Sequence, residues 1–198
     1  MSISADLVKE LRERTGAGVL DCKKALEKTG GDLEKAIEEL RKMGLAKADK
    51  KLDRETKEGI VEAYIHPGAR LGVLVEVNCE TDFVANTEEF RKLAHNIALQ
   101  IAAMAPKYIK REDIPQDVVE KEKQILKEQL IREGKPENVV NKIVEGKMEK
   151  FYQENVLYDQ ELFMEPGITI EEYLKQHIAR FSENIRIKRF ARFKIGEE

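Results

Sequence analysis

The segment Val77-Asn78-Cys79-Glu80-Thr81-Asp82-Phe83-Val84 lies where two hydrophobic patterns meet. It closes a run in which every odd-numbered residue from Leu71 onward is apolar, and that alternation is typical of a half-buried β-strand. It is followed at Asn86 to Glu89 by residues that favour the start of a helix. The sequence therefore predicts a strand-to-helix corner, held at the surface by the elements on either side of it.

This corner carries three candidate site residues, Thr81, Asp82 and Phe83. A large apolar ring beside a carboxylate on a rigid corner is suited to contact with a partner. In the alternative interpretation, Phe83 turns back into the core and Asp82 caps the following helix. The local sequence does not distinguish the two orientations of Phe83, so both stay open.

Three helices are predicted before the first strand, because apolar residues recur there with helical spacing. Glycines separate the helices, and Gly44 is expected to end the third. A solvated linker, with helical structure in part of it as an alternative, is expected over residues 45–57, which have no apolar period, and a domain boundary is expected near residue 54. The apolar residues of the three helices are Ile3, Leu7 and Leu11, then Cys22, Ala25 and Leu26, then Leu33, Ala36, Ile37 and Leu40.

One apolar residue does not fit this three-helix bundle. Leu20 lies on the opposite side of its helix from Ala25 and Leu26. With Arg12 on the neighbouring helix, it indicates a small docking patch. The alternative is a solitary surface leucine, which is common in folded proteins.

The rest of the chain predicts an α+β core. Alternating residues predict antiparallel strands over Gly59–His66 and Leu71–Cys79, and a wide apolar stripe predicts a covering helix over about Glu88–Met104. A capping box at Thr169 to Glu172 opens a further helix, and Ile185–Ile195 forms the last strand. The expected architecture is a small three-stranded antiparallel sheet covered by helices.

Between these elements, two helices over about 116–133 and 136–154 flank Gly134-Lys135-Pro136. Their apolar residues form only a narrow seam, so the pair is expected to project as an antiparallel coiled-coil hairpin. The predicted domains are thus 1–54, the bundle and linker, and 55–198, the core with its arm at about 116–154.

Composition limits the partners. The 198 residues include 35 basic and 38 acidic side chains, closely intermixed, with a net charge of -3. Without a global positive field, direct binding of nucleic acid or of an acidic membrane is not expected, and a protein partner is favoured. The basic last strand lacks stacking aromatics beyond Phe190.

Because the sequence contains neither a membrane-length apolar run nor a secretory signal, a cytoplasmic location is expected.

No catalytic arrangement is recognisable in the sequence. Gly16-Ala17-Gly18 opens a helix with no strand before it, so it does not match a phosphate-binding loop. Cys79 with His66 resembles a thiol site, but a second histidine and a set of oxyanion donors are missing. Cys22 and Cys79 have no metal-ligand spacing. We therefore expect no enzyme activity, no metal and no cofactor.

A three-stranded sheet covered on one face leaves its other face or an edge exposed. A second copy of the chain related by two-fold symmetry is the expected cover, giving a non-covalent homodimer. Phe190 is our predicted contact, because it is apolar on an otherwise basic face of the last strand. Arg189 breaks the alternation in the opposite sense, on the apolar face.

Two long segments, Lys9 to Gly18 and Glu76 to Ala85, closely resemble the two signatures of the translation elongation factor Ts family. The resemblance also extends over Asp21 to Leu26 and Gly31-Asp32, and the order of predicted elements is similar throughout. It implies a factor that promotes GDP release from elongation factor Tu, with a ubiquitin-associated-like first domain.

By position, the resemblance implies that Arg12, Val19 and Leu20 dock the partner. It also implies that the Thr81-Asp82-Phe83 corner acts beside the partner's magnesium and phosphate site. Val19 and Leu20 depart from the family, in which methionines are familiar at these positions, although the apolar character is kept. The competing hypothesis is a scaffold that binds through its bundle and coiled coil without promoting exchange.

Overall fold

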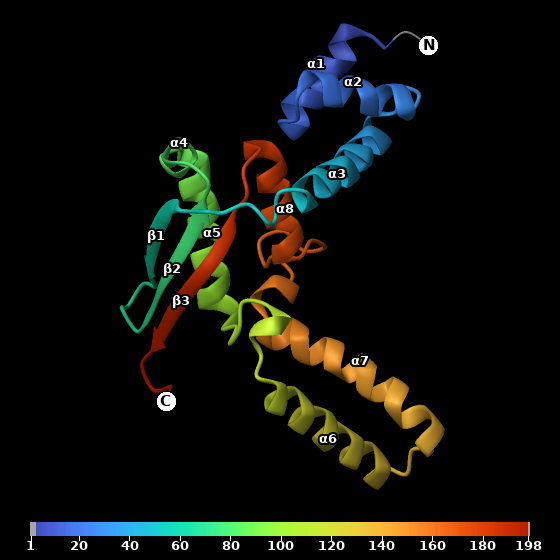
Figure 1. Cartoon of the computed structure of the whole chain (residues 1–198), viewed down its shortest axis with the longest axis vertical. Coiled ribbons are helices and arrows are strands. Elements are labelled where there is room, and N and C mark those ends of the chain that lie inside the picture. The colour runs from blue at the N-terminus through green and yellow to red at the C-terminus, as the bar shows by residue number, and fades with distance from the viewer. Residues whose placement is uncertain (1–2, 198) are drawn as a thin grey trace. The chain divides into compact units, whose positions relative to one another are not determined.

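A computed structural model describes residues 3–197, which contain eight α-helices and three strands (Figure 1). They form two compact units, which we call the bundle unit and the sheet unit. The bundle unit contains the chain up to Gly59 with Asn78–Thr87 and Glu172–Arg186, and the sheet unit contains Ile60–Val77, Glu88–Glu171 and the chain from Ile187 onward. The units alternate along the sequence, and the domain division near residue 54 stays a prediction.

Helices α1 (Ala5–Thr15), α2 (Val19–Lys28) and α3 (Leu33–Asp49) form the three-helix bundle. Side-chain caps fix two of their starts: the Ser4 hydroxyl accepts from the Leu7 amide, and the Asp32 carboxylate accepts from the Lys35 amide at 3.0 Å. The predicted apolar faces meet in one core and confirm the bundle. Its buried residues are Leu11, Cys22, Ala25, Leu26, Ala36 and Leu40.

The predicted end of α3 is wrong. The helix continues through Gly44 to Asp49, and Ala48 is fully buried, so residues 45–57 are not simply a solvated linker. Gly44 serves close packing, because a Cβ built there would lie 3.4 Å from the Cβ of Ala179 in α8 (Ile170–Phe181). Gly44 therefore lies inside α3, at a contact with α8, and does not end the helix.

The three strands form an antiparallel sheet in the order β1 (Glu58–Ile65), β2 (Leu71–Cys79) and β3 (Arg186–Lys194), with β2 in the centre. The hairpin register is fixed by a bond from the His66 amide to the Leu71 carbonyl, at 2.9 Å. On the other side of β2, the Ile195 amide donates to the Arg70 carbonyl at 2.9 Å. The predicted strands and their pairing are confirmed.

Helix α5 (Glu88–Met104) covers one face of this sheet (Figure 1). The Arg192 side chain of β3 reaches the Ala102 carbonyl of α5, and His95 of α5 lies 2.8 Å from the Glu62 carboxylate of β1. The helix buries the apolar stripe that predicted it. The buried members are Phe90, Leu93, Ala94, Ile97, Ala98 and Ile101, which face Val73, Val75 and Val77 as the buried side of β2.

Helices α6 (Gln116–Arg132) and α7 (Glu137–Asn155) form the predicted hairpin arm. Its seam has a small buried core of Leu130, Val140, Val144 and Met148. The turn residues predict Gly134 as the C-cap of the first helix and Pro136 as the first residue of the second. In the structure Glu133 is the C-cap of α6 and Pro136 is the N-cap of α7. Short helices η1 (Arg111–Asp113) and η2 (Leu157–Asp159) lie at the base of the arm.

Candidate partner-binding site

The corner after β2 is a single-turn helix, α4 (Asp82–Ala85). Thr81 is its N-cap, and the Thr81 hydroxyl accepts from the Val84 amide at 3.4 Å. Asp82 is the first residue of this short helix, which the sequence did not predict, and it lies exposed there, six residues before the start of the helix that the alternative expected it to cap.

Phe83 points to solvent. Its side chain is 83% exposed, more than any other large hydrophobic residue described in the structure. The inward position of α4 is taken by Ala85, which is 5% exposed and lies about 200° around the helix from Phe83. Of the two orientations left open by the sequence, the structure has the outward one.

Arg12, Val19 and Leu20 are exposed on the bundle. Val19 and Leu20 form the first residues of α2, with exposures of 51% and 73%, and Arg12 lies in the last turn of α1. Leu20 faces away from the bundle core, as its helical position predicts. Thr81, Asp82 and Phe83 thus gather at one corner, whereas the other three lie on two neighbouring helices.

Phe190 is half-buried on β3. The Arg189 guanidinium pairs with Glu76 of β2 at 2.7 Å, on the sheet face away from α5. Because side chains alternate along a strand, Phe190 lies on the other face, together with Arg192, which bonds to α5. The side of the sheet opposite α5, which we call the outer face, carries a different set of exposed apolar residues: Val61, Ile65, Leu74 and Phe193.

The sequence interpretation missed this outer face for a physical reason. The sequence places Phe193 among the odd-numbered residues of the last strand, together with Ile185 and Ile187, which are buried. Which side of the sheet stays open depends on the pairing with β2, and the alternation along one strand does not give that pairing. The sequence signal for this face is Arg189, a charged residue at an odd position of the strand, because charged side chains are seldom buried; in the structure it pairs there with Glu76.

Cys79 does not provide a reactive thiolate. Its side chain is buried, and burial, with a smaller contribution from the Glu183 charge, raises the thiol pKa to about 11. Its thiol donates to the Thr81 carbonyl at 3.1 Å. His66 instead bonds to the Tyr64 hydroxyl, at 2.8 Å. This geometry gives no support to the thiol-site interpretation.

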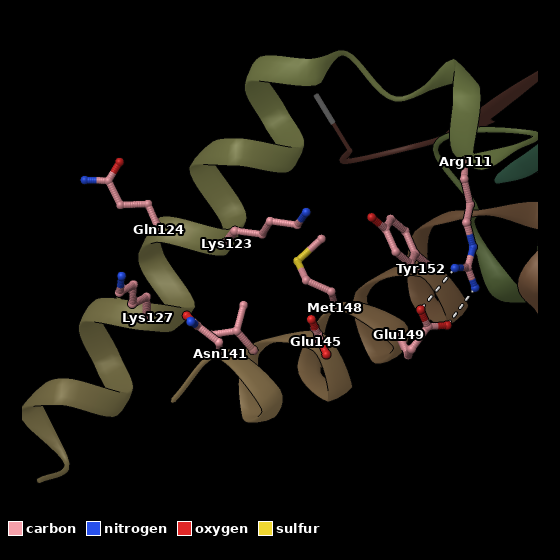
Figure 2. Close-up of a pocket in the computed structure, with 10 residues that line it drawn as sticks. Arg111, Lys123, Gln124, Lys127, Asn141, Glu145, Met148, Glu149 and Tyr152 are labelled. Atoms are coloured by element: carbon pink, nitrogen blue, oxygen red, sulfur yellow. Dashed lines mark hydrogen bonds and ion pairs between the residues drawn. The ribbon is translucent and has the colours of Figure 1, made fainter. Parts of the chain in front are cut away.

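A groove of about 640 Å³ lies between α6 and α7 (Figure 2). Its apolar floor is Val144 and Met148, and its rim is charged, with Lys123 and Lys127 from α6. Arg111 closes one end by pairing with Glu149 at 2.7 Å. Hydrogen bonds to Asp159, and to a smaller extent to Glu149, raise the pKa of Arg111. The Arg111 guanidinium therefore stays charged at all ordinary pH values.

Among residues 3–197, no group of three or more His, Cys, Asp or Glu side chains is arranged to hold a metal ion. Within the same range, none of the helices has the length and apolar character needed to cross a bilayer.

Three features of the chain are typical of a protein that acts by binding another protein. They are the outward Phe83 at the corner, the exposed apolar pair on the helical bundle, and the two-helix arm. The sequence model of the family Elongation factor TS matches residues 6–197, so the chain belongs to the elongation factor Ts family. The resemblance inferred from the two signature segments is confirmed.

Individual relatives are similar over nearly the whole chain. Elongation factor Ts of Caldanaerobacter subterraneus subsp. tengcongensis is 62% identical over 98% of this chain and 98% of the relative. The protein of the same name from Thermosipho melanesiensis is 57% identical over 98% and 100%, and that from Carboxydothermus hydrogenoformans 58% over 98% and 90%. This membership assigns the chain to translation elongation and supports a role in nucleotide exchange on elongation factor Tu.

Proposed function

We propose that this protein promotes GDP release from elongation factor Tu by inserting Phe83 beside the nucleotide site. The observation that carries the proposal is the 83% exposure of Phe83 on a corner whose backbone is fixed. Burying a phenylalanine side chain is worth about 1.5–3 kcal/mol, which is available only once a partner covers the ring.

The mechanism needs no chemistry from this chain. A GTPase holds GDP through backbone amides around the phosphates and a magnesium ion that neutralises their charge. A ring inserted between elements of the partner near that site displaces some of these groups and so weakens the binding of GDP. By linkage, GDP weakens binding of this protein by the same factor. Asp82, exposed in the same turn, is proposed to lie beside the magnesium and phosphate site.

Arg12, Val19 and Leu20 are proposed as the docking surface of the bundle. An exposed pair of aliphatic side chains next to a guanidinium provides an apolar contact with a charged edge, which is common at protein interfaces. Docking here raises the local concentration of the corner at its target, because the two surfaces belong to one chain.

The test is release of fluorescently labelled GDP from purified elongation factor Tu. Under this proposal, the chain accelerates release in a concentration-dependent manner that saturates. Binding to elongation factor Tu without acceleration would instead support the scaffold interpretation and reject exchange.

A homodimer formed through the outer face is the second part of the proposal. Val61, Ile65, Leu74 and Phe193 are each between 47% and 69% exposed on the three adjacent strands. Monomeric soluble proteins rarely leave such a contiguous apolar surface uncovered. A second copy related by a two-fold axis covers it with the same residues.

A further inference from the structure

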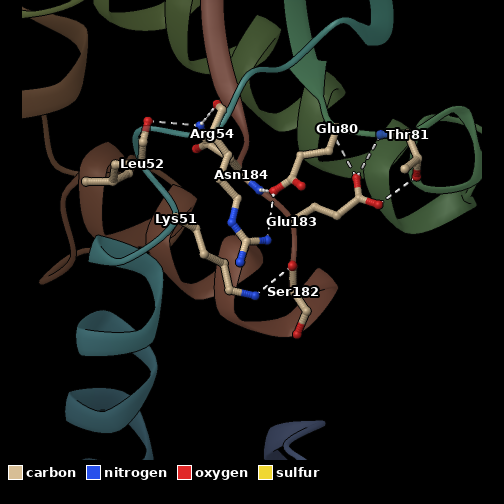
Figure 3. Close-up of polar contacts among 8 residues, drawn as sticks. All are labelled: Lys51, Leu52, Arg54, Glu80, Thr81, Ser182, Glu183 and Asn184. Carbon is tan, nitrogen blue, oxygen red and sulfur yellow. Dashed lines mark hydrogen bonds and ion pairs between the residues drawn. The ribbon is translucent and has the colours of Figure 1, made fainter.

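The Glu183 carboxylate bonds to three groups of the two residues that precede α4 (Figure 3). One oxygen accepts from the backbone amides of Glu80 and Thr81, at 3.1 and 3.0 Å, and the other accepts from the Thr81 hydroxyl at 2.6 Å. Bonds to an ionised carboxylate are about twice as strong as neutral ones. The contact joins residues more than 100 positions apart.

These bonds add to the one from the Cys79 thiol to the Thr81 carbonyl, and they hold the two backbone amides that link β2 to α4. Strand β2 ends at Cys79 and α4 has only four residues, fewer than an isolated helix needs to be stable. Thr81 is both the N-cap of α4 and the partner of Glu183. The direction of α4, and with it that of Phe83, therefore depends on where Glu183 holds Thr81.

The turn that carries Glu183 is itself fixed. Asn184 is fully buried. Its backbone amide donates to the Glu80 carboxylate at 2.6 Å. Its side-chain amide donates to the backbone carbonyls of Leu52 and Arg54, at 3.0 and 2.7 Å. The Lys51 ammonium also donates to the Ser182 carbonyl, at 2.6 Å (Figure 3). Glu183 is thus held from both sides.

We propose that Glu183 is a positioning residue for the exchange corner: it fixes the start of α4 so that Phe83 is presented to the partner in one orientation. The inference rests on the proposed role of Phe83 in exchange. It adds that the side chain that sets the active geometry lies on the α8–β3 turn, away from the partner-contacting residues in sequence.

The test compares labelled-GDP release by Glu183→Ala, Glu183→Gln and a matched control, Glu172→Gln. The control loses a carboxylate of the same unit that pairs with Arg41 at 2.8 Å. Glu183→Ala is expected to slow saturated release by about tenfold or more, because small misplacements of an acting group are costly. Glu183→Gln keeps one acceptor for the two amides and should restore part of the rate, and Glu172→Gln should match the wild type.

A double-mutant cycle separates positioning from general destabilisation. If Glu183 acts through Phe83, Glu183→Ala should cost less than about twofold in a Phe83→Ala background, because coupled residues are not additive. An undiminished cost in that background, or wild-type release by Glu183→Ala, would overturn the proposal.

Backbone hydrogen exchange of the free protein provides a readout that does not depend on elongation factor Tu. Glu183→Ala should increase exchange at residues 80–85 by about tenfold or more while α5 stays protected, since the lost bonds are local. Unchanged protection at the corner in Glu183→Gln and Glu183→Ala overturns the inference even if they are active. A wild-type protein that fails to accelerate GDP release from elongation factor Tu rejects the proposed function. The hydrogen-exchange measurement still decides in that case whether Glu183 fixes the corner.

Discussion

Asp82 and Phe83 are adjacent at the corner but are expected to contribute unequally. The Asp82 carboxylate is exposed, and most of its interaction with a partner charge is offset by lost hydration. Asp82→Ala should therefore weaken the exchange complex by less than about 1 kcal/mol, with an effect that shrinks as salt is added. Release rates at low and high salt measure this. A loss for Asp82→Ala larger than that for Phe83→Ala, at every salt concentration, would contradict the assignment of Phe83 as the anchor.

Cys79 predicts how stability changes at alkaline pH. Its thiol pKa is raised from 9.0 to about 11 in the folded chain, so the folded state keeps a proton that the unfolded state loses. The associated stability is fully present below pH 9 and is lost as pH rises from about 9 to about 11, by roughly 2–3 kcal/mol. Urea unfolding of wild type and Cys79→Ala over this range provides the comparison. Parallel pH profiles for the two proteins would show that the thiol is not linked to folding.

At this scale the sequence predicted which residues form the corner but not which way Phe83 points. The reason is that Glu183, which holds the Thr81 backbone, is 102 positions away along the chain. The single turn of α4 before the predicted helix was not predicted either. Phe190 shows the same limit, because its face depends on the register of β3 against β2.

Among the elements, the two helical glycines Gly44 and Gly146 are expected to respond in opposite ways to substitution. A Cβ at Gly44 meets Ala179 at 3.4 Å, whereas a Cβ at Gly146 in α7 meets nothing within 4 Å. Gly44→Leu should destabilise the protein by about 1–3 kcal/mol through overpacking. Gly146→Ala should stabilise it by about 0.5–1 kcal/mol through helix propensity. Chemical denaturation tests both, and a stabilising Gly44→Leu would refute the close approach of α3 to α8.

Helix ends were predicted well where an apolar stripe runs along the whole helix. They were predicted poorly where part of a helix has no stripe and packs on a segment distant in the sequence. The predicted bounds of α5 match the structure, and those of α6 and α7 differ by a residue at each end where they differ at all. The last five residues of α3, 45–49, were assigned to the linker because Lys, Asp and Ala give no apolar period there. Its cover is α8, about 130 residues later, to which Arg41 is paired through Glu172.

For the whole molecule, the outer face predicts how the chain associates. Phe193→Asp places a charge in the proposed contact and should convert a dimer to a monomer, because an unpaired buried charge is costly. Phe190→Asp, on the face covered by α5, is the matched comparison and should leave the dimer in place. Light scattering at micromolar concentration measures both. A monomeric wild type would remove the dimer, and a dimer lost only in Phe190→Asp would favour the contact predicted from sequence.

The central claim is that an exposed aromatic on the α4 corner drives GDP release, and one comparison tests it most directly. Labelled-GDP release from elongation factor Tu is measured with wild type, Phe83→Ala and, as control, Phe163→Ala, which alters a 45% exposed ring elsewhere in the chain. Phe83→Ala should lose about 2 kcal/mol of stabilisation of the exchange complex, or about 30-fold, as for a typical aromatic hot spot. Its thermal unfolding should be unchanged, and Phe163→Ala should release GDP like the wild type. A folded Phe83→Ala that accelerates release as well as the wild type would contradict the account.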